Sequence, residues 1–187
     1  MRYALFATIA VLAFAGCNKG TVDEKNASIE QVAKAIAGAS SATRFTPGRW
    51  ETSVSVTGID APNLPPQALA GAKAAMGKAH VVATCLSPED AAHPEKNFFS
   101  RDVKNCRYDH FTMGGGKIDA ELTCGGPVAG LASAPQSSVR MAGTYDPTHY
   151  NMTMATRAEQ GPGGAMTINM AMTSHLAGAC RGDELKG

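Results

Sequence analysis

The segment "CRYDHFTMGGGKIDAELTC", residues 106–124, constrains the fold more than any other part of the chain. Cys106 and Cys124 are equidistant from Gly115, the middle of three consecutive glycines. A chain that turns back at these glycines forms a β-hairpin whose two ends place the cysteines opposite each other, within reach of a cross-strand disulfide. The segment therefore predicts a disulfide-stapled antiparallel pair of strands.

The same turn predicts which side chains share a face of the hairpin. The pairs expected on the inward face are Tyr108 with Leu122, His110 with Ala120, and Thr112 with Ile118. The opposite face would carry charged side chains and be solvated: Arg107, Asp109, Asp119 and Glu121.

Cysteine pairing elsewhere follows from this hairpin. Setting Cys17 aside leaves four cysteines, which allow three pairings. The symmetry of the hairpin selects Cys106–Cys124 and leaves Cys85–Cys180. In the loop-entropy model the shorter closure contributes about 3 kcal/mol and the longer one somewhat under about 5 kcal/mol. A structural role accounts for all four, so none is assigned to catalysis or to a metal.

The amino terminus, "MRYALFATIAVLAFAGC", has the form of a secretory signal peptide over residues 1–16. Its apolar run is too short to span a bilayer. Cleavage after Ala15 would give plain secretion and leave Cys17 as an odd free thiol. The end of the run also resembles a bacterial lipobox, although Phe14 stands where leucine is commonest. The even count of the other cysteines favours Cys17 as a lipidation site. By resemblance to lipoproteins of Gram-negative bacteria, Asn18 then implies delivery to the outer membrane, facing the periplasm.

Charge and length narrow the class of protein. Loss of Arg2 with the leader leaves 16 basic and 16 acidic residues. A neutral chain with no basic run argues against nucleic acid as a partner. A mature length of 171 residues suits one domain plus a tether. The expected membrane contact is through the N-terminal lipid.

Patterning along the chain predicts the domain limits and the fold. Residues 17–46 are expected to be a tether with a short helix that starts at Ser28, residues 47–181 a β-domain, and residues 182–187 a C-terminal tail. A proline-led, alanine-rich stretch, "LPPQALAGAKAAMGKA", predicts an inserted helix. "RWETSVSV" alternates as a half-buried strand, and residues around 139–157 form a second hairpin in which Tyr145 faces Tyr150. We expect a mainly β fold: an antiparallel meander of about seven strands, as a curved sheet or a partial barrel.

Several landmarks together resemble a known family. They are "PGRWE", "CLSPED", the two-cysteine hairpin, "GTYDPTHY" and the closing Gly178-Ala179-Cys180. In this order they are similar to bacterial domain-of-unknown-function family 3617, small exported proteins of which many carry lipoprotein signals. The resemblance covers about residues 47–180. It implies an envelope location and a disulfide pattern, and it brings no activity.

The sequence contains no recognisable catalytic or metal-binding motif. None of the histidines at 80, 93, 110, 149 and 175 has metal-motif spacing to another, and no Gly-x-Ser-x-Gly elbow is present. We therefore expect no catalytic residues, no cofactor and no metal. A weakly supported candidate for a catalytic pair is His110 with Asp109 or Glu121. Strand alternation argues against it, because it points these carboxylates away from His110.

The methionines carry the one chemically suggestive pattern. Six of them can share one face of the sheet: Met141, Met152, Met154, Met166, Met170 and Met172. One interpretation is that they fill a core poor in aromatic residues and leucine. Another is an adaptable apolar ligand surface. A third is a soft site for Cu(I).

The function predicted from these features is that of a non-enzymatic envelope lipoprotein. Its β-domain would bind an apolar small molecule or an envelope protein, or would be structural. The alternatives are a methionine-rich copper-handling module and, less favoured, an enzyme with a dispersed site.

Overall fold

The computed structural model describes residues 20–39, 44–93, 105–125, 136–159 and 164–186. The expected leader at 1–16 and the expected lipidation site Cys17 lie outside these residues. In the described part of the chain, no helix combines the length and the apolar character that crossing a membrane requires.

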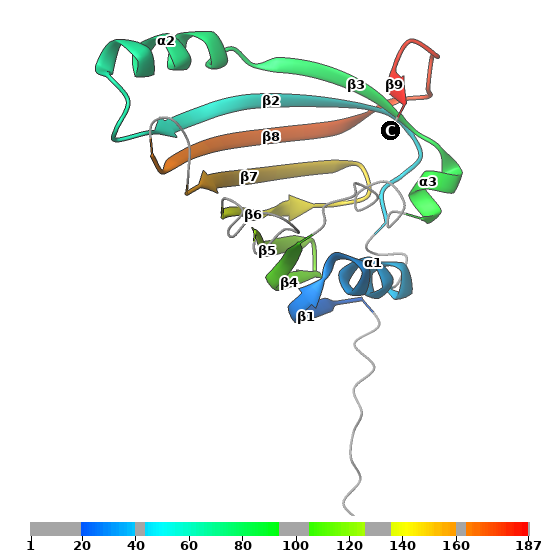
Figure 1. The fold of residues 1–187 in the computed structure, drawn as a ribbon. Coiled ribbons are helices and arrows are strands. Elements are labelled where there is room, and N and C mark those ends of the chain that lie inside the picture. The colour runs from blue at the N-terminus through cyan, green and yellow to red at the C-terminus, as the bar shows by residue number, and fades with distance from the viewer. Residues whose placement is uncertain (1–19, 40–43, 94–104, 126–135, 160–163, 187) are drawn as a thin grey trace, which may run out of the picture.

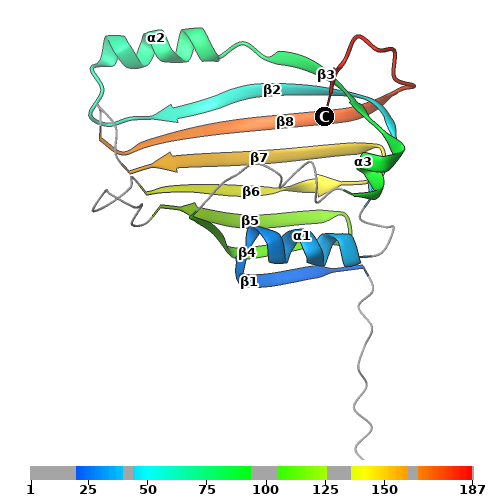
Figure 2. The same cartoon turned by 45° about the vertical axis from the view of Figure 1, so that its right-hand side comes forward.

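Nine strands form one open, curved sheet in the order β1-β4-β5-β6-β7-β8-β2-β3-β9 (Figures 1 and 2). Their bounds are β1 Val22–Ser28, β2 Gly48–Asp60, β3 His80–Leu86, β4 Cys106–Gly114, β5 Lys117–Cys124, β6 Ser137–Tyr145, β7 His149–Ala158, β8 Met166–Gly178 and β9 Leu185–Lys186. Neighbouring strands are antiparallel except β3 and β9, which are parallel. The mainly β, antiparallel fold class is confirmed.

The two outermost strands come from segments that we expected to lie outside the sheet. β1 falls within the predicted tether and pairs with β4, so that Ala27 lies opposite Tyr108. β9 falls within the predicted tail and pairs with β3, so that Leu185 lies opposite Thr84. The sequence did not predict strands within the tether or the tail, and the structure adds one to each. Short edge strands of this kind cover backbone groups that a bare sheet edge would expose.

Three helices accompany the sheet: α1 Ile29–Gly38, α2 Pro66–Met76 and α3 Pro88–Ala92. α1 begins with the predicted capping box, in which the Ser28 hydroxyl accepts from the Gln31 N–H at 3.2 Å and the Ser28 N–H donates to the Gln31 side chain at 2.7 Å. α3 is capped by Ser87, with Pro88 in its first turn. α2 buries none of its residues and lies beside the β2–β3 edge of the sheet (Figure 1).

α1 packs on one face of the sheet at the β1–β4–β5 end and forms a hydrophobic core there (Figure 2). Val32 is fully buried and Phe111 is 1 % exposed. Burying side chains of this size contributes about 1.5–3 kcal/mol each. Burial also raises the pKa of Tyr108, a third member of the cluster, to about 12. α1 is therefore part of the main hydrophobic core.

The β4–β5 hairpin departs from the predicted register at one residue. Cys106 lies opposite Cys124 and Tyr108 opposite Leu122, as predicted, but a bulge between Tyr108 and His110 shifts the rest. His110 then pairs with Glu121, while Phe111 pairs with Ala120 and Met113 with Ile118. The predicted pairs of His110 with Ala120 and of Thr112 with Ile118 were wrong. The bulge lets the large side chains of Phe111 and Met113 reach the core beneath α1.

Candidate functional site

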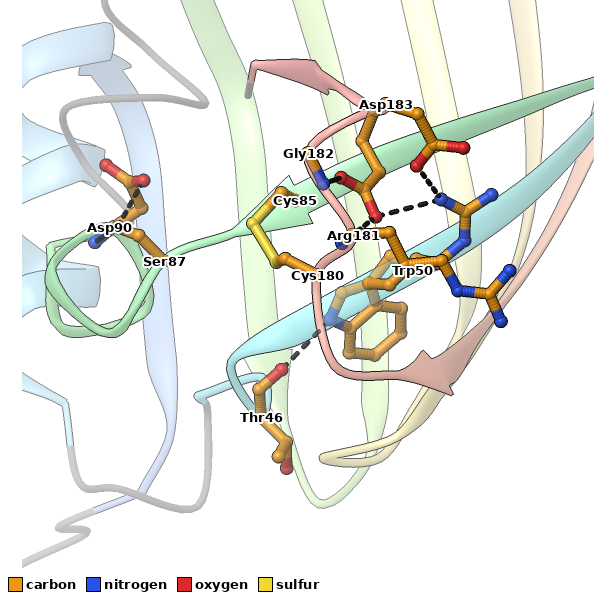
Figure 3. Close-up of a disulfide and its surroundings, with 11 residues drawn as sticks. Thr46, Trp50, Cys85, Ser87, Asp90, Cys180, Arg181, Gly182 and Asp183 are labelled. Carbon is orange, nitrogen blue, oxygen red and sulfur yellow. Dashed lines mark hydrogen bonds and ion pairs between the residues drawn. A yellow bond between two sulfur atoms is a disulfide. The ribbon is translucent and has the colours of Figure 1, made fainter.

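Both predicted disulfides are present and staple the sheet at two places. Cys106–Cys124 joins the open ends of β4 and β5, with Cα atoms 4.0 Å apart. Cys85–Cys180 joins β3 to the segment that follows β8, with Cα atoms 5.5 Å apart (Figure 3). Their loops span 18 and 95 residues.

Two carboxylates of the segment after Cys180 bind an arginine of β2, and Figure 3 labels one of them, Asp183. We call these three residues the C-terminal clamp: Arg49, Asp183 and Glu184. Arg49 Nη1 lies 2.8 Å from carboxylate oxygens of both Asp183 and Glu184. The Glu184 side chain is 1 % exposed, and its oxygens also accept from the N–H groups of Arg181 and Gly182 at 2.7 and 2.8 Å. Sequence reasoning missed this arrangement because the tail offers no pattern beyond its charges.

The electrostatics of the clamp favour the ionised pair. Burial of the Glu184 carboxylate raises its pKa, but hydrogen bonds from the Arg181 N–H, the Arg49 side chain and the Gly182 N–H outweigh this and lower the pKa to about 2. The bonds to Glu184 and then Glu51 raise the pKa of Arg49 above its ordinary value. The clamp is therefore an ionised network that ties the C-terminal segment to β2.

The six predicted methionines share one face of the sheet, which we call the methionine face. Register partners in an antiparallel sheet lie on the same side. Met141, Met154 and Met170 follow one another across β6, β7 and β8, and Met152 lies opposite Met172 in the next row. Ala120 is the partner of Met141 on β5 and belongs to the core under α1, so the methionine face is the face that α1 packs on.

The methionine face is only partly covered. All six methionines are half-buried: Met141, Met152, Met154, Met166, Met170 and Met172. Met141 packs against the core under α1. Among the described residues, the other five are not part of that core. The apolar surface thus continues from α1 across β7 and β8.

Four aromatic side chains bound the methionine face at one end: Phe45, Trp50, Tyr145 and Tyr150. Phe45 meets the other three edge-on, with ring centroids 5.3 to 6.0 Å away. Trp50 is 4 % exposed, and its indole N–H donates to the Thr46 carbonyl oxygen at 2.9 Å. The register of Tyr145 opposite Tyr150 was predicted, whereas the role of Phe45 was not.

A shallow groove of about 560 Å³ lies on the opposite face of the sheet. Most of its lining residues alternate along the strands with the methionines, and small residues are frequent among them, including Ala142, Ala155 and Ala171. Four residues of the methionine face also border it: Ala120, Met141, Met154 and Met170. At the β4–β5 end stand a hydrogen-bonded pair, His110 Nε2 with Asp119 Oδ1 at 2.6 Å, and an ion pair, Arg140 Nε with Glu121 Oε1 at 2.9 Å.

The bulge in β4 changes the candidate for enzymatic chemistry. We expected His110 to point inward, away from the carboxylates; instead it lies in the groove beside Asp119 and opposite Glu121. Asp109 turns to accept from the Thr123 hydroxyl at 2.7 Å. Glu121 accepts from Arg140 and Asp109 from Thr123, while the carboxylate hydrogen-bonded to His110 is that of Asp119, which the sequence did not single out for this role. Of the residues lining this groove, none is a serine or cysteine that a histidine–aspartate pair could activate.

The part of the chain that the structure describes holds no group of three or more histidine, cysteine, aspartate or glutamate side chains arranged to hold a metal ion. The geometry thus offers two surfaces for binding, the methionine face and the groove behind it.

Residues 45–180 match the model of a family described as a protein of unknown function, DUF3617. The chain belongs to this family. No curated protein and no solved structure matches it. The DUF3617 region contains both disulfides, all six methionines and the whole aromatic cluster, while β1, α1 and β9 lie outside it.

Proposed function

We propose that this DUF3617 protein is a lipid-anchored, non-enzymatic domain of the cell envelope that binds an apolar molecule on its methionine face. The anchor is the Cys17 expected from the sequence, and the location is the periplasmic side of the outer membrane of a Gram-negative bacterium. Two disulfides are in keeping with an oxidising compartment.

The observation that carries the binding proposal is the partly exposed run of methionines across β7 and β8. Met154 and Met170 lie side by side there, as do Met152 and Met172. Thioether side chains are flexible and polarisable, so a surface made of them adapts to ligands of different shape. The aromatic cluster bounds this surface at one end, and α1 bounds it toward β4. The resulting strip suits an extended apolar group such as an acyl chain.

A polar substitution on this face tests the proposal. The mature chain would be titrated with a fluorescent fatty-acid probe, in wild-type form and as Met154→Gln and Met170→Gln. Glutamine keeps the length of methionine and adds an amide that has no hydrogen-bond partner when an apolar ligand covers it. We therefore expect the affinity of each variant for the probe to fall by a factor of about ten or more.

The matched control is Thr153→Gln, on the same strand and on the opposite face. It should bind the probe as the wild type does. Equal loss in Thr153→Gln and Met154→Gln, or no saturable binding by the wild type, would refute the methionine face as an apolar site. An intact-mass measurement of the native protein would reveal a co-purified ligand independently.

The register also favours one second candidate, a Cu(I)-handling surface. Met141, Met154 and Met170 are successive neighbours on three strands, so three thioethers are brought to one row. Thioethers are soft ligands that select Cu(I). Titration with Cu(I) against a competing chelator decides this: if the protein takes no metal from the chelator, the copper alternative is wrong.

A further inference from the structure

Two histidines with no motif spacing in the sequence lie side by side in the sheet. His149 opens β7, and His175 stands near the end of β8; the two are register partners. They belong to the face opposite the methionines, because His175 alternates with Ser174 and Leu176 along β8. This pair is therefore separate from the surface proposed above, and the inference does not depend on it.

The alternation of hydrogen-bonded and non-hydrogen-bonded pairs between β7 and β8 brings these two side chains close. The Leu176 N–H donates to the Thr148 carbonyl oxygen at 2.8 Å, so residues 148 and 176 occupy a hydrogen-bonded position. Hydrogen-bonded and non-hydrogen-bonded positions alternate along an antiparallel pair. His149 and His175 thus form a non-hydrogen-bonded pair, the kind in which side chains are closest, with Cβ atoms about 4.5–5.5 Å apart.

The surroundings of His149 orient its ring. Its Nδ1 is 2.8 Å from the Thr148 hydroxyl and 3.5 Å from Asp146 Oδ1. Asp146 in turn accepts from the N–H groups of Thr148 and His149 at 2.7 and 2.8 Å, which fixes the carboxylate. A histidine whose Nδ1 side is held by a hydroxyl and a carboxylate presents Nε2 outward, the arrangement commonly found behind metal-bound histidines.

Negative charge also flanks His175. Glu51 is its register partner on β2: Glu51 Oε2 lies 4.0 Å from His175 Nε2, while Glu51 Oε1 accepts from Arg49 Nε at 3.2 Å. The nearby positive charge of Arg49 is balanced by the two carboxylates of the C-terminal clamp. Both imidazoles are more than half exposed, with side-chain exposures of 61 % and 55 %, so a cation reaches them from solvent.

We propose that His149 and His175 form a two-histidine surface site for a borderline divalent cation such as Cu²⁺, Ni²⁺ or Zn²⁺. Imidazole nitrogen is the ligand that these ions prefer, and Cu²⁺ binds tightest in the usual order of affinities. The protein supplies two ligands and water completes the coordination. A bound ion ties β7 to β8 at the end of the sheet.

The test measures the affinity of the mature chain for Cu²⁺ and Zn²⁺ by competition with a chromogenic chelator. The chain carries Cys17→Ser, which removes the one cysteine outside the two disulfides. Single variants His149→Gln and His175→Gln should each weaken Cu²⁺ binding by a factor of about ten or more. Mutating a group that hydrogen-bonds to a metal ligand already lowers metal affinity by about this factor, and losing the ligand itself should lower it at least as much. His80→Gln, an exposed histidine on β3, is the matched control and should bind as the wild type does.

A second readout separates metal binding from loss of folding. Without metal, all variants should melt at the wild-type temperature, since the substituted side chains are exposed. Zn²⁺ should raise the melting temperature of the wild type and of His80→Gln, and should leave that of His149→Gln unchanged. Equal affinity in the wild type and the His149→Gln/His175→Gln double variant would overturn the proposal.

Discussion

At the scale of single residues, Gly143 shows how closely the strands beneath the methionine face approach. A Cβ at this position would stand 2.2 Å from the Asn151 carbonyl oxygen and 2.9 Å from the Met152 Cα. Both are backbone atoms of β7, the neighbouring strand, and cannot turn aside as a side chain can. The glycine is therefore required by close backbone packing between β6 and β7.

We predict that Gly143→Ala destabilises the protein by about 1–3 kcal/mol, the usual cost of forcing extra atoms into a packed site. Urea unfolding followed by circular dichroism measures it. Gly71→Ala in α2 is the control, because a Cβ there meets nothing within 4 Å. In a helix this change should stabilise by up to about 1 kcal/mol. The interpretation of Gly143 fails if both substitutions have the same sign.

The residue scale is also where sequence reasoning met its limits. The alternation of Met152 and Met154, and the pairing of Tyr145 with Tyr150, could be predicted because the β6–β7 hairpin is regular. The face on which His110 lies could not be predicted, because a bulge of one residue moves it to the other side of the sheet. The bulge is favourable because it buries Phe111 against α1, a tertiary contact that the hairpin sequence alone does not reveal. The pairing of His149 with His175 depends on the register between β7 and β8, which no local turn fixes.

At the scale of elements, the sequence predicted the internal strands better than the edges. Strands β2 to β8 are the seven of the expected meander, since their alternation and turn residues are local signals. β1 is polar along most of its length, and only Val22 and Ala27 are buried in it. β9 has two residues. Segments this short or this polar become strands because they pair with β4 and β3 at the edges of the sheet. Their own residues therefore do not predict them.

The last strand and its loop are held by the clamp, which makes an element-level prediction about pH. The pKa of Glu184 is lowered in the folded protein to about 2, from an ordinary value of about 4.3 in an unfolded chain. A lowered pKa means that the folded state favours the ionised form. The stabilisation is thus complete above about pH 4.3 and is lost as the pH falls toward 2.

Glu184→Gln removes this titration while keeping the size of the side chain. We expect the variant to be less stable than the wild type at pH 7, and its melting temperature to fall less between pH 5 and pH 2.5. Thermal unfolding at a series of pH values measures both effects. Parallel curves for the two proteins over this range would show that Glu184 does not carry the acid dependence.

At the scale of the whole molecule, the arrangement is one-sided. α1 and the aromatic cluster lie on one face of a single curved sheet, and the other face presents alanines and short polar side chains, with charged residues at the β4–β5 end. Most single sheets in proteins are covered by a second layer. Here the cover is partial among the described residues, and the two disulfides add the cross-links that a thin core benefits from. A sheet built this way leaves an extended, partly exposed face among the described residues, which is the surface that the proposed apolar binding uses.

The lipid anchor is the whole-molecule prediction on which the proposed location depends. Protein extracted from a Gram-negative envelope should have the mass of a chain that starts at Cys17 with added acyl groups and two disulfides. Replacement of Cys17 by serine should abolish the acyl mass and release the protein into the soluble periplasmic fraction, because the rest of the chain keeps its fold without the anchor. Intact-mass spectrometry before and after reduction, with fractionation of both forms, makes the measurement. A wild-type chain that starts at Gly16 with a free thiol would contradict the anchor, and Cys17 would then be a reactive or intermolecular cysteine of a soluble periplasmic protein.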